Sequence, residues 1–119
     1  MNALKECQIH HEQSGDIDVL CLDGAMDSYS FPRLESSLNS LQTGRRNRII
    51  LDCERLTFIN SAALGALIGH ARRAREQGGD LKLAALTPKI ASIVELLGFD
   101  RILQTFATPQ QATESFANR

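Results

Sequence analysis

The stretch "NRIILDC", residues 47–53, constrains the fold more than any other segment of the chain. Three apolar side chains follow one another at positions 49–51, between polar ends. A strand that is apolar on both faces is typical of a central strand buried in a parallel sheet. Parallel neighbours need long crossover connections, usually helices, so this segment indicates an α/β fold.

Helix and strand patterns alternate after this segment. We expect "ERLTF" to form a turn, followed by a helix over residues 61–77 that ends at Gly78-Gly79. The apolar residues of this helix share one face, whereas His70, Arg72, Arg73 and Glu76 are expected on its solvated side. "DLKLAAL" predicts the next strand, and a helix follows it from the Thr87 cap to Gly98. The short strand "RILQTF" and a final polar helix over residues 109–119 complete the pattern.

The N-terminal half predicts two further strands and one helix. "ECQIHHEQ" alternates weakly and "DIDVLCLDG" strongly, and "SGD" between them is typical of a hairpin turn. Ser30 is the expected cap of a helix that has Pro32 in its first turn and ends at Gly44. We therefore predict a single α/β domain over residues 1–119, with a mostly parallel sheet of four to five strands and about four helices.

Composition argues against two classes of partner. Thirteen Lys and Arg stand against fourteen Asp and Glu, and the chain has no Trp, so neither a basic field nor stacking platforms favour nucleic acid. No apolar run approaches the roughly 20 residues of a membrane span, and the N-terminus shows no apolar leader. We expect a cytoplasmic protein without a membrane span.

Cofactor and metal chemistry find no matching motif in the sequence. Neither of the glycine-rich phosphate-binding patterns occurs, so no bound cofactor is expected. The cysteines, Cys7, Cys21 and Cys53, lack the paired spacing of zinc sites and are expected to be buried thiols. His10 and His11 are interpreted as an exposed pair on a strand, so no metal site is expected.

Ser61 stands where the central strand meets the next helix. Asn60 and Ser61 are both residues that cap helices, and capping alone would explain them. The sequence around Ser61 lacks the glycines of a nucleophile elbow, and His70 lies about 13 Å further along the same helix, so no catalytic residue is expected. A phosphate on Ser61 would be accepted easily, because a helix N-terminus offers free N–H groups and a positive dipole.

The residues quoted so far resemble the STAS domain family, in particular bacterial anti-sigma factor antagonists. Three segments carry the resemblance: "VLCLDGAMDSYSFPRLESSL", "RIILDCERLTFINSAALGALIGHARRAREQGGDLKL" and "LTPKIASIVELLGFDRIL". The family commonly has Asp-Ser-[Ser/Thr]-Gly-Leu-Gly where this chain has residues 60–65, "NSAALG". Asn60 therefore replaces an acidic residue, Ala62 replaces a serine or threonine, and Ala63 replaces a glycine. At position 63, we expect the added methyl group to meet the backbone of a partner.

The resemblance implies a non-enzymatic switch that works through partner binding. The unmodified protein would sequester a kinase-type anti-sigma factor and so free a sigma factor. Phosphorylation of Ser61 by that kinase would break the complex, and a serine phosphatase would restore it. The partner surface implied by the family lies at the helix start and the preceding loop, at Asp27, Ser28, Asn60, Ser61, Ala62, Ala63 and Leu64.

An alternative remains open because the motif is altered. The chain could instead be a STAS adaptor subunit that works without phosphorylation, in a lipid-transport ATP-binding cassette complex or in a sensory scaffold.

Overall fold

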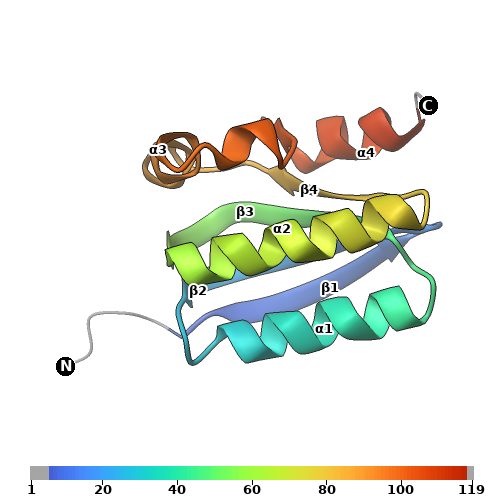
Figure 1. Cartoon of the computed structure of the whole chain (residues 1–119), viewed down its shortest axis with the longest axis horizontal. Coiled ribbons are helices and arrows are strands. Elements are labelled where there is room, and N and C mark those ends of the chain that lie inside the picture. The colour runs from blue at the N-terminus through green and yellow to red at the C-terminus, as the bar shows by residue number, and fades with distance from the viewer. Residues whose placement is uncertain (1–5, 118–119) are drawn as a thin grey trace.

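Five strands form one mixed sheet in the computed structural model, which describes residues 6–117 (Figure 1). The sheet order is β1-β2-β3-β4-β5, with β1 antiparallel to β2 and every other neighbouring pair parallel. The strands are β1 (Gln8–Ser14), β2 (Ile17–Met26), β3 (Arg48–Ile59), β4 (Asp80–Ala84) and β5 (Thr105–Phe106). The helices are α1 (Phe31–Thr43), α2 (Ser61–Glu76), α3 (Pro88–Leu96) and α4 (Pro109–Ala117), with a short 3-10 helix at Phe99–Arg101. The predicted α/β fold is confirmed.

The helices cover the two faces of the sheet unequally. α1, α2 and α3 pack on one face, where Ile49 and Leu51 of β3 are fully buried. α4 packs on the other face, where Phe116 meets Ile50 of the same strand. The apolar run of β3 is therefore buried on both sides, as its sequence predicted. α1 and α2 lie side by side with their N-terminal ends at the same end of the molecule (Figure 1).

The turn that connects α2 to β4 requires both glycines. Gly78 has a φ of +86°, a conformation that glycine adopts without strain. At Gly79, a Cβ atom would lie 1.9 Å from the backbone oxygen of Asn47. Any larger residue at position 79 would therefore displace the backbone where β3 begins.

The central strand is longer than the sequence pattern indicated. The prediction of a turn at "ERLTF" is wrong, because β3 continues to Ile59 and pairs with β2 along its whole length. Leu56 and Ile59 are buried and hold this second half of the strand in the core. The charged pair Glu54-Arg55 lies where the register between β2 and β3 shifts, which breaks the apolar pattern without ending the strand.

Other local predictions need correction. Ser30 precedes α1 in a helical backbone conformation, and its side chain does not cap that helix. His70 is buried on the side of α2 that faces α1, not solvated. In "RILQTF", only Thr105 and Phe106 form a strand, because Arg101 belongs to the 3-10 helix. The last two residues of the predicted C-terminal helix, 118 and 119, lie outside the described residues.

None of the helices within residues 6–117 combines the length and the apolar character that crossing a membrane requires.

Candidate functional site

Ser61 is the first residue of α2 and is exposed to solvent. Asn60 before it has an extended backbone, and its Oδ1 accepts a hydrogen bond of 2.8 Å from the N–H of Ala63. This is the geometry of an N-cap, which leaves other N–H groups of the first turn without a helical partner. The predicted role of Asn60 as a helix cap is confirmed.

The histidines whose contacts the structure gives are engaged with partners other than Ser61. The ring nitrogens of His70 contact Glu35 and Gln42 on α1, at 3.0 and 2.9 Å. His11 contacts Asp18 near the start of β2, and His10 lies on β1. A serine nucleophile needs a base within hydrogen-bond reach, and the contacts of these histidines do not supply one to Ser61.

The loop after β2 lies next to Ser61. β2 and β3 are parallel neighbours, and their last paired residues are Met26 and Ile59. The N–H of Asn60 also donates to the backbone oxygen of Met26, at 3.3 Å. Parallel strands end at the same edge of a sheet, so Asp27 and Ser28 leave that edge beside the start of α2.

Asp27 organises this loop. Its Oδ1 accepts hydrogen bonds from the N–H groups of Tyr29 and Ser30, at 2.9 and 3.1 Å, and from the Ser30 hydroxyl at 2.9 Å. The hydrogen bonds from the Ser30 side chain and backbone lower the pKa of Asp27 below its ordinary value of 3.8. The carboxylate is therefore ionised at neutral pH and holds the loop in one conformation.

The seven residues predicted to bind a partner fall into two groups. Ser28, Ser61 and Ala62 are exposed, and Asp27 and Asn60 are partly exposed. Ala63 and Leu64 are only 1% exposed, and both belong to the hydrophobic core. The expectation that the Ala63 methyl group meets a partner is wrong, because that side chain faces the interior of this protein.

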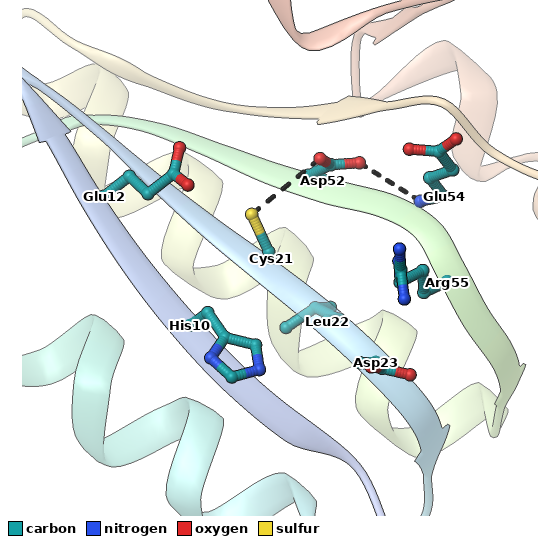
Figure 2. Close-up of a pocket in the computed structure, with 8 residues that line it drawn as sticks. All are labelled: His10, Glu12, Cys21, Leu22, Asp23, Asp52, Glu54 and Arg55. Atoms are coloured by element: carbon teal, nitrogen blue, oxygen red, sulfur yellow. Dashed lines mark hydrogen bonds between the residues drawn. The ribbon is translucent and has the colours of Figure 1, made fainter.

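A shallow hollow of about 280 Å³ lies on the sheet face away from α1 and α2 (Figure 2). It is lined by His10, Glu12, Cys21, Leu22, Asp23, Asp52, Glu54 and Arg55. The Cys21 Sγ lies 3.8 Å from Asp52 Oδ2, and burial together with that carboxylate raises the pKa of Cys21 to about 11. Such a thiol stays protonated at neutral pH and is a poor nucleophile or metal ligand.

The other two cysteines are buried, as the sequence predicted. Burial raises the pKa of Cys7, and it raises that of Cys53 to about 12. Within residues 6–117, no group of three or more His, Cys, Asp or Glu side chains is arranged to hold a metal ion.

Comparison with known proteins places this geometry in a family. The model of the STAS domain matches residues 8–112, which include both strand ends and the start of α2. The chain belongs to the STAS domain family. BtrV of Bordetella bronchiseptica, which carries the name of an anti-sigma factor antagonist, is 30% identical to this STAS domain over 98 residues. The aligned residues cover 82% of this chain and 84% of BtrV.

A second sequence relative and two solved structures were also found. The anti-sigma-B factor antagonist of Bacillus subtilis is 30% identical over 97 residues, covering 81% of this STAS domain and 86% of that protein. The unphosphorylated form of the anti-sigma factor antagonist SpoIIAA superposes with a TM-score of 0.79 at 20% identity, covering 94% of this chain and 98% of SpoIIAA. The phosphorylated form of SpoIIAA, from Bacillus, superposes with a TM-score of 0.71 at 21% identity. The superposition covers 92% of this chain and 99% of SpoIIAA. SpoIIAA thus shares the STAS fold.

One exposed residue of this edge was missed by the sequence patterns. Tyr29, between Ser28 and Ser30, is 87% exposed, the largest exposed fraction among the large hydrophobic side chains described. The sequence did contain one indication that Tyr29 is exposed. It is an aromatic residue in a loop between a predicted strand and a predicted helix, and it belongs to the apolar pattern of neither.

Proposed function

We propose that this STAS domain is an anti-sigma factor antagonist switched by phosphorylation of Ser61. In its unphosphorylated form it binds a kinase-type anti-sigma factor and so releases a sigma factor. The partner contacts the edge formed by Asp27, Ser28 and the exposed residues 60–62. A serine phosphatase removes the phosphate and restores binding.

The observation that carries the proposal is the position of Ser61. It is an exposed hydroxyl on the first residue of α2, in a chain about 30% identical to two proteins named as antagonists of anti-sigma factors. A phosphate there would meet free N–H groups and the positive end of the helix dipole, so the fold can accept the charge. A partner packed on the same surface would have to desolvate that charge, which opposes binding.

The test pairs the protein with a candidate kinase-type anti-sigma factor. The protein and that factor are incubated with ATP, and the phosphorylated residue is located by mass spectrometry. Ser28, which is exposed, and Ser37, which is partly exposed, serve as internal controls. We expect phosphate on Ser61 alone in the wild type and none in the Ser61→Ala variant. Phosphate on another serine, or none, would contradict the switch.

A result without phosphate would point to the adaptor alternative only if the protein still bound a transporter or scaffold subunit. That outcome is measured by the same mixing experiment with those subunits in place of the anti-sigma factor.

A further inference from the structure

Tyr29 is exposed to an unusual degree for a large side chain. Its exposed fraction is 87%, and its ring makes no hydrogen bond or ring contact with residues 6–117. Leu96 on α3 is comparably exposed, at 85%. An aromatic ring held in water contributes little to the stability of the fold. A single exposed apolar side chain is common on protein surfaces, so the position of Tyr29 has to carry the argument.

The loop that carries Tyr29 is rigid. The Asp27 carboxylate accepts from the N–H of Tyr29 itself at 2.9 Å. The fully buried Ser30 hydroxyl shares its one hydrogen between Asp27 Oδ1 and the backbone oxygen of Ala25, at 2.9 and 2.8 Å. The N–H of Phe31 donates to the Asp27 backbone oxygen, also at 2.9 Å. The backbone on both sides of Tyr29 is thus fixed, and its outward direction is a property of the folded loop.

The loop also lies beside the proposed switch. The Met26–Ile59 pair and the hydrogen bond from Asn60 to Met26 place Asp27 and the residues after it next to the start of α2. Figure 1 shows α1 and α2 beginning at the same end of the molecule, so the loop before α1 and Ser61 share one end of the molecule. One partner surface can therefore reach both.

We propose that Tyr29 is the aromatic anchor of the partner interface, inserting its ring into an apolar recess of the kinase-type anti-sigma factor while that factor covers Ser61. This inference rests on the proposed function and adds the residue that supplies most of the affinity. A Tyr side chain buries a large area, and its two rotatable torsions lose little entropy when it is bound. A rigid loop reduces the ordering cost further, because the bound conformation already exists in the free protein.

The experiment measures the dissociation constant of the unphosphorylated protein with the kinase-type anti-sigma factor by calorimetry. Three variants are compared with the wild type: Tyr29→Ala, Tyr29→Phe and Leu96→Ala. Leu96→Ala is the matched control, because it removes an equally exposed apolar side chain from another element. We expect Tyr29→Ala to weaken binding at least about 30-fold, as removal of an interface hot spot does, and the other two to stay within about threefold.

The melting temperature provides the folding control. We expect the Tyr29→Ala variant to melt within about one degree of the wild type, because no packed neighbour loses a contact. Binding of Tyr29→Ala within threefold of the wild type would overturn the anchor and leave the proposed function intact. If Leu96→Ala weakened binding as much as Tyr29→Ala, the anchor role of Tyr29 would also be overturned, because the loss would then not be specific to Tyr29. If the wild type itself did not bind, the proposed function would fail, and the anchor with it.

Discussion

Asn60 acts on α2 through a single hydrogen bond, from the N–H of Ala63 to its side-chain oxygen. Replacing it with alanine removes the cap and leaves one more N–H of the first turn without a partner. We expect Asn60→Ala to lower the free energy of unfolding by about 1 kcal/mol, measured by urea denaturation. Asn60→Asp keeps the acceptor and adds a charge that suits the helix N-terminus, so it is expected to be at least as stable as the wild type. A destabilised Asn60→Asp variant would contradict the cap geometry.

Asp27 makes the loop sensitive to acid. Its pKa is lowered in the folded protein, chiefly by the hydrogen bonds from Ser30, so its charge stabilises the fold above the ordinary value of 3.8 and this contribution is lost as the pH falls through the lowered pKa. Asp27→Asn removes the charge but keeps an oxygen acceptor. We expect this variant to melt below the wild type at pH 7, with the difference shrinking below pH 3.8. A difference that did not depend on pH would contradict an ionic role for Asp27.

At the scale of elements, α1 and α2 are joined by a buried polar contact. Gln42 is 5% exposed, donates to the backbone oxygen of His70 at 3.0 Å, and contacts the His70 Nδ1 through Oε1 at 2.9 Å. Gln42→Leu would leave the buried His70 Nδ1 without this partner, which costs about 1–3 kcal/mol, whereas the His70 backbone oxygen keeps its helical hydrogen bond within α2. We expect that loss in the free energy of unfolding by urea denaturation.

A second contact between the same helices provides the control. Arg73 donates to the Asn39 side chain at 3.2 Å, and this hydrogen bond is exposed. Arg73→Ala is expected to change the free energy of unfolding by less than about 0.5 kcal/mol. If Gln42→Leu were no more costly than Arg73→Ala, the buried contact would not stabilise the pair of helices.

For the whole molecule, the sequence predicted the features that depend on local patterns. The β3 run, the Asn60 cap and the end of α2 just before Gly78 all follow from neighbouring residues. What it missed depends on distant partners. Residues 54–59 stay in a strand because β2 pairs with them across a register shift, and His70 is buried because α1 covers it.

For the candidate site, too, the sequence indicated the local features and missed those that depend on distant residues. Ser61 and the Asp27 loop were identified from the motif, and the parallel pairing of β2 with β3 explains why they meet. The burial of Ala63 and Leu64 depends on how α2 is rotated against the sheet, which the quoted motif does not contain. The rigidity of the Tyr29 loop likewise depends on Ser30 reaching back to Ala25.

The central claim is that a negative charge on Ser61 prevents partner binding and leaves the fold unchanged. The most direct measurement is the dissociation constant of the kinase-type anti-sigma factor for the unphosphorylated protein and for the protein phosphorylated on Ser61, with the melting temperature of each. We predict that phosphorylation weakens binding at least about 100-fold, as expected when a desolvated interface receives an unpaired charge. The melting temperature should stay the same or rise, because an acidic group at a helix N-terminus is favourable by about 0.3 to 1 kcal/mol. Equal affinity of the two forms, or a large fall in melting temperature, would contradict the account.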